Sequence, residues 1–410
     1  MENIRHSTSL RKSNHKFNKN PTKNYSSQPK PRLRKGPVDV PFVIILFVLL
    51  VMGLIMMFSA GYAWAIEENH PGDYYFQRQL RFALLGLAAA FAASHFDYHH
   101  FMKKWIVIGI FGVSILLLIL CLTGPFVSPH NGSYRWVQIG PIPEFQPSEV
   151  AKFAVVVTFA VLFVKYQKKL DKFAYGIVPF LAILGLIAAL LMQERHLSAT
   201  IIIGIIGVIM MFVGGSSLKH LIPLGIAAVA GLAGLLAYSY LSDSENLYFG
   251  DRITAWLNPF DPALADNLTW QTRQSLIAIG SGGWFGLGLG NSRQKFLYLP
   301  ESKNDFVFAI VCEELGFFGA LVVLLIFLLF IIRGFHIASH APDKLGMLLA
   351  VGLTAQIGIQ ALLNIAVVTN TIPNTGISLP FFSYGGTALV MQLAQMGVIL
   401  NISRQSIIDT

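Results

Sequence analysis

Charged residues are scarce in this chain of 410 residues, since Asp, Glu, Lys and Arg together make up 12% of it while hydrophobic residues make up 54%. A soluble globular protein has about 25% charged residues. Cysteine is scarcer still, because Cys121 and Cys312 are the two in the sequence and both lie in apolar runs. Their spacing fits neither a disulfide framework nor a zinc site. The composition is typical of an integral membrane protein.

Patterns for several common catalytic chemistries are also missing. The sequence has no Walker pattern, no Ser-His-Asp arrangement and no cluster of His, Cys and Asp with metal-ligand spacing. It has no segment typical of a cytoplasmic ATPase domain, and no internal repeat is evident. The sequence therefore indicates no metal site and no cofactor.

Apolar runs long enough to cross a bilayer are abundant instead. We expect an all-α integral membrane protein with about ten membrane-spanning helices in one polytopic domain, residues 41–405. The expected spans are 41–62, 79–95, 105–123, 149–164, 174–193, 197–213, 220–241, 306–332, 345–369 and 386–402. Residues 242–305 form a large loop before the eighth span. Because loops of this length are functional or disordered and this one is not of low complexity, we expect it to fold back onto the bundle.

Basic residues predict the orientation of these spans. Residues 1–40 contain ten Lys and Arg and form a disordered basic tail. With this tail inside the cell, cytoplasmic segments hold twenty of the thirty Lys and Arg, so both termini are expected inside, including the C-terminal end 406–410. The large loop is then extracellular. The formal charge of +9 follows from this topology and does not indicate nucleic-acid binding.

Unusual residues gather in four segments of the expected outer face. The first is NGSYRWVQIGPIPEFQPSEVAK, residues 131–152, with Arg135 and Trp136 in a loop bounded by glycines. Pro147 is expected to open a helix in which Glu149 and Lys152 share one face. A surface ion pair at the membrane interface would explain that pair. A charge at the edge of the hydrocarbon region is also a functional candidate by default.

The second segment is GSGGWFGLGLGNSRQKF, residues 280–296, which is dense in glycine. One interpretation is a flexible loop at the membrane surface. The other is close approach of the backbone to a ligand, with Arg293 and Lys295 beside it to hold an anion. The absence of a strand–helix context argues against dinucleotide binding.

The third segment is LPESKNDFVFAIVCEELGF, residues 299–317, where Asp305 directly precedes a long apolar run. Asp305 could be a helix N-cap, in which case the helix dipole keeps it ionised. An ionised carboxylate on the outer face is also what a general base requires. Glu313 and Glu314 lie deeper, and we expect one of them to meet a polar or basic partner in a structural role.

The fourth segment is GISLPFFSYGGTA, residues 376–388. Pro380 interrupts regular structure, and Gly385 and Gly386 allow a turn. A polar, irregular segment at the membrane edge is tolerated where it lines a wet cavity, so Ser383 and Tyr384 are expected to face one. Together the four segments predict a pocket on the outer face with several cations and one carboxylate.

Three long stretches resemble the SEDS family of bacterial cell-wall proteins (shape, elongation, division and sporulation). They are SYRWVQIGPIPEFQPSEVAKF, IAIGSGGWFGLGLGNSRQKFLYLPESKNDFVFAIVCEELGF and NTIPNTGISLPFFSYGGTALVMQLAQMGVILNISRQS. The resemblance extends over nearly all of residues 40–405. VMGLIMMFSAGYAWA in the first span and the NISR end are more similar to the division and sporulation branch than to the elongation branch. One departure is ERHLSAT, where many members have a Pro-Asp-Leu-Gly-like turn.

The resemblance implies a ten-span glycosyltransferase that polymerises lipid II, works with a class B penicillin-binding transpeptidase and meets other division proteins. It implies that Asp305 is the essential aspartate. It also implies that the residues matching the family's other motifs bind the substrate: Arg135, Trp136, Gln146, Ser148, Glu149 and Lys152. A divalent cation that assists the pyrophosphate stays open, as does the choice between division and sporulation.

Two other function classes fit parts of the sequence. A lipid II flippase would also have ten spans and a cationic cavity, but it should show polar breaks near the midplane and access from the cytoplasm. A scaffold for division proteins would need neither Asp305 nor the cations. The gathering of unusual residues on the outer face favours chemistry there.

Overall fold

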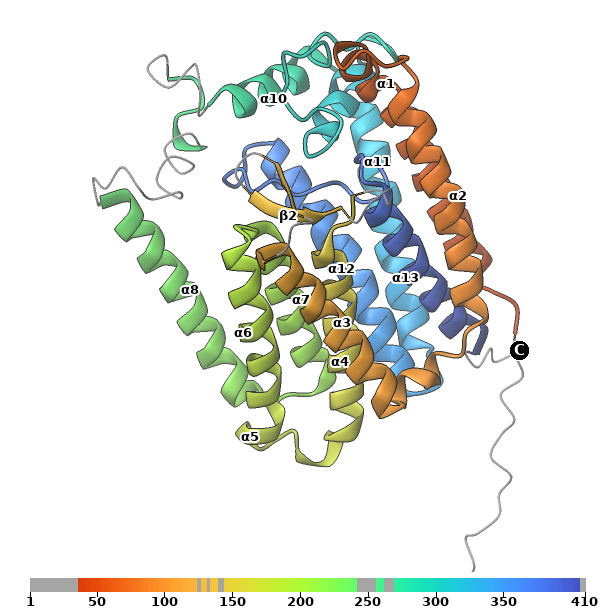
Figure 1. Ribbon diagram of the computed structural model, residues 1–410, viewed down its shortest axis with the longest axis vertical. Helices are drawn as coiled ribbons and strands as arrows, with labels where there is room; N and C mark the ends of the chain where they lie inside the picture. The colour runs from red at the N-terminus through yellow and green to blue at the C-terminus, as the bar shows by residue number, and fades with distance from the viewer. Residues whose placement is uncertain are drawn as a thin grey trace, which may run out of the picture. The chain divides into compact units, whose positions relative to one another are not determined.

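The computed structural model describes residues 36–123, 127–130, 133–138, 144–241, 256–261 and 269–405. Within these ranges ten helices have 16 residues or more. They are Val40–Glu67 (α1), Tyr74–His95 (α2), Lys104–Thr123 (α3), Pro147–Lys165 (α4), Val178–Gln193 (α6), Leu197–Gly214 (α7), Leu218–Leu241 (α8), Val307–Ser339 (α11), Lys344–Val368 (α12) and Gly386–Gln405 (α13). The all-α class is confirmed, and each of the ten expected spans overlaps one of these helices (Figure 1).

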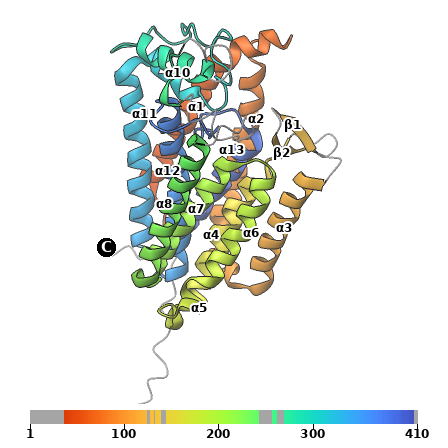
Figure 2. The ribbon, with the colours of Figure 1, turned by 90° about the vertical axis from the view of Figure 1, so that its left-hand side faces the viewer.

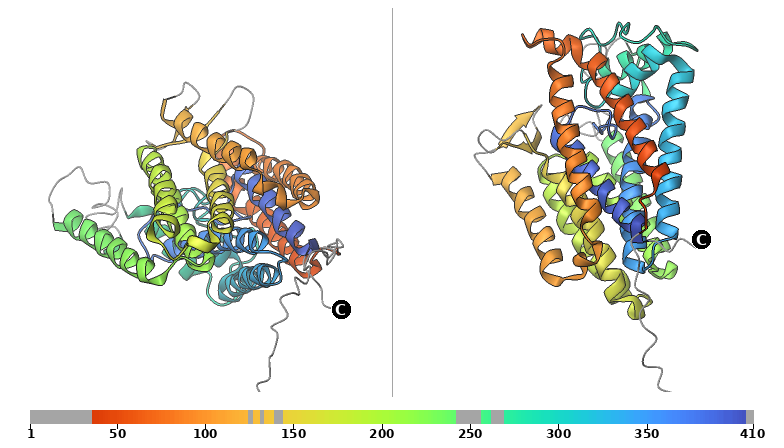
Figure 3. Two further views of the ribbon diagram at one scale, coloured as in Figure 1. Left: turned by 90° about the horizontal axis from the view of Figure 1, so that it is seen from below. Right: turned by 90° about the vertical axis from the view of Figure 1, so that its right-hand side faces the viewer.

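Seven of the described helices are long and apolar enough to cross a membrane, namely α1, α3, α4, α7, α11, α12 and α13. Helix α6 is a shorter apolar helix, and α8 has an apolar first half. In the bundle α2 packs against α13, and α11 packs against α1 and α12. Helix α8 stands apart from the other helices in Figures 1 and 3 and meets α7 where the two join.

Two short strands are an addition that the hydropathy pattern did not predict. Val127–His130 (β1) and Ser133–Val137 (β2) pair antiparallel, with Val127 opposite Val137. An isolated bridge then joins Val137 to Phe145, just before α4. This hairpin lies beside the upper end of the bundle in Figure 2, next to the end at which α4 begins. It positions the loop residues that precede α4.

Helix α11 was expected as one uninterrupted run, and this expectation is wrong at Gly316. That residue has φ 67° and ψ −168°, so the helix is kinked there. The glycine-rich segment passes against the kink: the Leu287 N–H donates to Glu313 O at 2.9 Å, and the Phe317 N–H donates to Gly283 O at 2.9 Å. A Cβ on Gly286 would lie 2.1 Å from Glu314 O. The glycines serve close backbone packing within the protein.

The span expected over 174–193 is also interrupted. A one-turn helix, Phe173–Gly176 (α5), ends before Ile177, whose φ of −129° is not helical, and α6 begins at Val178. Pro179 explains the break, because proline has no N–H to donate to the carbonyl four residues earlier.

The described part of the large loop packs onto the bundle as expected. Helix Trp270–Ser281 (α10) contacts α11 and α12, and its Ser275 hydroxyl donates to Val368 O at 2.7 Å. Trp256 Nε1 donates to Asn370 O at 3.0 Å. Residues 242–255 and 262–268 of this loop, and the tail residues 1–35, lie outside the described residues.

The end of the bundle opposite α10 collects the basic residues assigned to the cytoplasm. They lie at the ends or connections of the helices there: Lys103, Lys104, Lys165, Lys168, Lys169, Lys172, Lys219, Arg333, Lys344 and Arg404. Arg333 forms a paired contact with Asp39, the N-cap of α1, at 2.7 Å. A basic end of this kind is what the positive-inside rule expects of the cytoplasmic side.

Candidate active site

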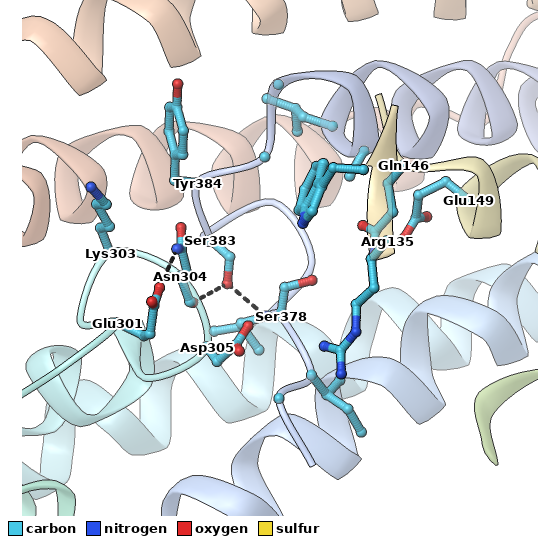
Figure 4. A pocket seen from close by; sticks show the side chains of 18 of the residues that line it. Arg135, Gln146, Glu149, Glu301, Lys303, Asn304, Asp305, Ser378, Ser383 and Tyr384 are labelled. Carbon is cyan, nitrogen blue, oxygen red and sulfur yellow. Dashed lines mark hydrogen bonds between the residues drawn. The ribbon is translucent and has the colours of Figure 1, made fainter. Parts of the chain in front are cut away.

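A cavity of about 860 Å³ lies at the end of the bundle away from the basic residues. Because successive helices run in opposite directions, the N-termini of α2, α4, α7, α11 and α13 meet at this end. The cavity is lined by residues from the ends of α2, α4, α7 and α13, from β2 and from segments 301–305 and 374–386. Figure 4 shows how side chains from these elements converge. Each helix N-terminus brings unsatisfied N–H groups and a positive dipole end.

Asp305 lies in the wall of this cavity, in a turn that leads into α11. The N-cap interpretation is wrong, because Phe306 occupies the N-cap position and makes no side-chain capping bond. Burial raises the pKa of Asp305 to about 7, the Glu301 carboxylate adds to this, and Arg135 opposes it. Asp305 is therefore not held fully ionised by a helix dipole. It is a carboxyl group that titrates near neutrality.

Three successive carbonyl groups fix the backbone at Asp305. Lys303 O accepts from the Tyr384 N–H at 2.9 Å, and Asn304 O accepts from the Ser383 hydroxyl at 2.6 Å. Asp305 O accepts from Asn364 Nδ2 of α12 at 2.7 Å. Ser383 and Tyr384 therefore hold the turn that presents Asp305, in addition to lining the cavity with Gly385.

Arg135 reaches the same part of the cavity from β2 (Figure 4). Its Nη2 donates to Arg195 O at 2.8 Å, which ties the hairpin to the α6–α7 turn. Gly376 lies between Arg135 and Asp305: a Cβ there would be 3.1 Å from Asp305 Oδ2 and 3.9 Å from Arg135 Nη1. The Asp305 carboxylate and the Arg135 guanidinium group therefore lie on either side of Gly376. Trp136, the next residue of β2, also lines the cavity.

The pair expected on α4 is present, but it is buried. Lys152 Nζ lies 2.7 Å from Glu149 Oε1 and donates to Gln360 Oε1 of α12 at 2.8 Å. Glu149 is 4% exposed and Lys152 is 2% exposed, so a pair on the helix surface is excluded. Pro147 begins α4 as expected, and Gln146 and Ser148 beside it also line the cavity.

Arg293 and Lys295, which were expected to hold an anion, do not line the cavity. Lys295 is 3% exposed and pairs with Glu314 at 3.0 Å, so its charge is neutralised inside the protein. This pair confirms the structural role expected of Glu314. Arg293 is exposed, and its backbone N–H donates to Glu313 Oε1 at 3.0 Å. Both residues belong to the packing of the glycine-rich segment on α11.

The turn between α6 and α7 contributes cavity residues that the sequence did not reveal. His196 and Ser198 line the cavity, and His196 Nε2 lies 3.3 Å from Gln146 Nε2. Burial lowers the pKa of His196 well below its usual range, and Arg135 and Lys152 add to this. His196 is therefore neutral at neutral pH. Burial raises the pKa of Glu194 to about 8 against the opposing charge of Arg135.

A second missed group surrounds Lys303. Its ammonium group lies 2.9 Å from Glu68 Oε1 and 2.6 Å from the Tyr75 hydroxyl, above the Tyr75 ring at 3.9 Å from the centroid. Trp64 Nε1 donates to Ser302 Oγ at 2.9 Å. These contacts fasten the Asp305 turn to the ends of α1 and α2. Lys303 lies two residues before Asp305 in the sequence, and this short separation was the signal that could have identified it as a site residue.

Among the described residues, no three of His, Cys, Asp and Glu lie close enough together to hold a metal ion. The polar groups of the cavity are several amides and hydroxyls, four cations and five carboxyl groups. The cations are Arg78, Arg135, Lys152 and Lys303, and the carboxyl groups are those of Glu68, Glu144, Glu149, Glu301 and Asp305. Such a cavity can bind an anion beside Arg135 and Lys152 and place a hydroxyl group against Asp305.

The bundle and its cavity define a multi-pass membrane protein with a charged site at one end. A family model for the FtsW, RodA and SpoVE proteins, described as "Cell cycle protein", matches residues 40–407. The chain belongs to this family, and the resemblance to the SEDS proteins is confirmed.

Two curated relatives show how far the similarity extends. "Stage V sporulation protein E" of Bacillus subtilis (strain 168) is 40% identical over 374 residues, which cover 91% of this chain and 99% of the relative. "Probable peptidoglycan glycosyltransferase FtsW" of Geobacter sp. (strain M18) is 36% identical over 89% of this chain and 96% of the relative.

Solved structures agree on the fold. A chain of the structure titled "Structural coordination of polymerization and crosslinking by a peptidoglycan synthase complex" aligns with a TM-score of 0.73 and 25% identity, over 90% of this chain and 98% of that one. The rod shape determining protein RodA of Thermus thermophilus aligns with a TM-score of 0.64 and 25% identity, over 91% and 98%.

Proposed function

We propose that this protein polymerises lipid II into β-1,4-linked glycan strands at the outer face of the bacterial cytoplasmic membrane. One observation supports the proposal above all others: Asp305 and Arg135 flank Gly376 in a cavity that also contains the buried Lys152. The opposite end of the bundle holds the basic residues, and by the positive-inside rule this supports an outer-face location of the cavity. The named relatives, among them a probable peptidoglycan glycosyltransferase, support the same reaction class.

In the proposed step, Asp305 accepts the proton of the acceptor sugar hydroxyl. The hydroxyl oxygen then forms a bond to the anomeric carbon of the donor sugar. The bond from that carbon to the pyrophosphate oxygen breaks, and its electron pair leaves with undecaprenyl pyrophosphate. A pKa of about 7 suits a general base, because such a base is substantially ionised at neutral pH and still binds the proton well.

Arg135 and Lys152 are proposed to stabilise the departing pyrophosphate. A lysine ammonium group has three N–H donors. Among the described residues Lys152 meets two acceptors, Glu149 and Gln360, so one donor is left for a ligand. Fixed charges and helix N-termini that surround the cavity need no reorganisation as the negative charge develops. We propose that Trp136, Gln146 and Ser148 contact the substrate beside them.

We further propose that the chain works with a class B penicillin-binding transpeptidase and other division proteins, at the septum or in sporulation. The support is the structural neighbour, which belongs to a peptidoglycan synthase complex by its title. The tests are co-purification with the transpeptidase and a gel of glycan products made with and without it. A partner that neither binds nor changes the product would contradict this part of the proposal.

Asp305→Asn tests the reaction directly. In the purified, reconstituted protein supplied with labelled lipid II, this variant is expected to lose at least about 10²-fold in polymerisation rate, the contribution of a positioned base. Asp171→Asn is the matched control, because Asp171 is exposed at the opposite end of the bundle. Wild-type polymerisation by Asp305→Asn would refute the assignment. If the wild-type protein translocates lipid II without making polymer, it is a flippase. If the wild-type protein does neither, it is a scaffold.

A further inference from the structure

Glu301 is a cavity residue to which the proposed reaction assigns no role. It lies four residues before Asp305 in the same turn and lines the cavity. Its carbonyl accepts the N–H groups of Asn304 at 2.9 Å and Phe306 at 3.2 Å. Asn304 Nδ2 donates to Glu301 Oε2 at 2.5 Å, as Figure 4 shows. The side chain of Glu301 thus closes the turn that presents Asp305.

The backbone of Glu301 is in an unfavourable conformation. Its φ is +54°, in the left-handed region. A residue with a Cβ atom pays about 1–2 kcal/mol there, and glycine would avoid this cost. Strained residues that persist in a cavity wall point to function, because the surrounding structure must hold them in place. The bonds to Asn304 and Phe306 supply that hold.

Glu301 also acts on Asp305 electrostatically, and the other charged groups around Asp305 set the size of this effect. Arg135 approaches from β2, whereas Lys303 on the same turn pairs with Glu68 and Lys152 on α4 pairs with Glu149. The other elements against the turn contribute these side chains: Asn364 and Gln360 from α12, His196 from the N-cap of α7, and Ser383 and Tyr384 from the segment before α13. After burial, Glu301 is the main influence that raises the pKa of Asp305.

We propose that Glu301 is a positioning residue for the general base: it closes the Asp305 turn through its bond to Asn304 and adds a second carboxylate to the cavity wall beside Asp305. A neutral residue of the same shape would keep the turn but leave a weaker base. The inference rests on the proposed function, since it concerns the same proton transfer.

The test is the pH profile of lipid II polymerisation by the reconstituted protein. For the wild type, the rate is expected to fall about tenfold per pH unit below about pH 7, because Asp305 must be ionised to accept a proton. Glu301→Gln keeps an acceptor for Asn304 but removes the charge. Removal of a like charge lowers the pKa of Asp305, so the acid limb should move to lower pH by roughly 0.5 unit or more. The plateau rate should also fall.

Two further variants separate electrostatics from structure. Glu301→Asp keeps the charge and should leave the acid limb near its wild-type position. Glu144→Gln removes a different carboxyl group from the cavity lining, one that does not figure among the influences on Asp305, and should not move the limb. A purely structural role of Glu301 would lower kcat equally at every pH.

The possible failures are distinguishable. If the wild type makes no polymer, or if Asp305→Asn keeps wild-type activity, the proposed function fails. If both behave as expected, two outcomes refute only the proposed role of Glu301. In one, the acid limb of Glu301→Gln coincides with that of the wild type. In the other, the acid limb of Glu301→Asp shifts as far as that of Glu301→Gln. Equal thermal stability of the variants in detergent shows that each is folded.

Discussion

Two buried Lys–Glu pairs lie near the same end of the bundle and differ in what their lysines contact. In the cavity pair, Lys152 meets Glu149 at 2.7 Å, and in the closed pair, Lys295 meets Glu314 at 3.0 Å. All four side chains are at most 5% exposed. The cavity pair lines the candidate active site, while the closed pair joins the glycine-rich segment to α11 outside the cavity lining.

The difference is in the number of acceptors. Lys295 donates to Glu314 Oε1, Ser59 Oγ and Gly290 O, which uses all three of its N–H groups. Within the described residues Lys152 has two acceptors, so its third N–H is available to a ligand. We therefore expect an equally buried charge to be structural where its hydrogen bonds are complete and functional where one N–H is open to the cavity. Paired substitutions test this distinction.

Lys295→Met should have the largest effect, and the effect should be on stability. It leaves Glu314 buried without its partner, which costs about 3–5 kcal/mol of unfolding free energy. Adding Glu314→Gln removes the stranded charge and should recover most of the thermal stability and the polymerisation rate. Thermal unfolding in detergent measures the first, and the lipid II assay measures the second. A stable Lys295→Met protein would show that the pair is not structural.

The same double replacement in the cavity pair should give the opposite outcome for activity. Lys152→Met with Glu149→Gln leaves no unpaired buried charge, so its thermal stability should stay close to that of the wild type. Its kcat/KM should still fall by about 10²–10³-fold, the usual loss when one group that stabilises transition-state charge is removed. Activity restored to the wild-type value would remove Lys152 from the proposed site.

Gly376→Ala should reduce polymerisation by up to about 10²-fold, because a methyl group would stand between the base and Arg135 and misplace both. The residue also has φ +70°, so the substitution adds about 1–2 kcal/mol of backbone strain. Gly283→Ala is the matched control from the glycine-rich segment. Its φ is +53°, but a Cβ there would meet nothing within 4 Å.

The two glycine variants should lose similar amounts of thermal stability, since both carry the same kind of strain. A loss of activity by Gly376→Ala alone assigns the effect to the space between Asp305 and Arg135. Equal activities of the two variants would show that this space is not where the reaction occurs.

The sequence predicted the helices well and the contacts less well. Long apolar runs determine where a helix can cross a membrane, so each expected span overlaps an observed helix. The kink at Gly316 could not be predicted, because it depends on the distant segment 283–288 that packs against it. The pairing of Lys295 could not be predicted for a similar reason: its partner Glu314 is 19 residues away in the chain.

Uncharged polar residues in apolar helices were a signal for site residues that the prediction from the sequence did not use. Gln360 and Asn364 lie four residues apart in α12, and both reach the site, one to Lys152 and the other to the Asp305 carbonyl. Amide groups in an apolar span are costly unless they are hydrogen-bonded. His196 was overlooked because its turn departs from the family pattern, although it lines the cavity.

Arg293→Gln should have the smallest effect of all. The side chain is exposed and outside the cavity lining, and the contact with Glu313 comes from its backbone N–H, which glutamine keeps. Surface substitutions of this kind change stability by about 0.5 kcal/mol or less. The polymerisation rate should therefore stay within about twofold of the wild type by the same free-energy scale. A large loss would return Arg293 to the substrate-binding set and would mean that the substrate extends from the cavity over the glycine-rich segment.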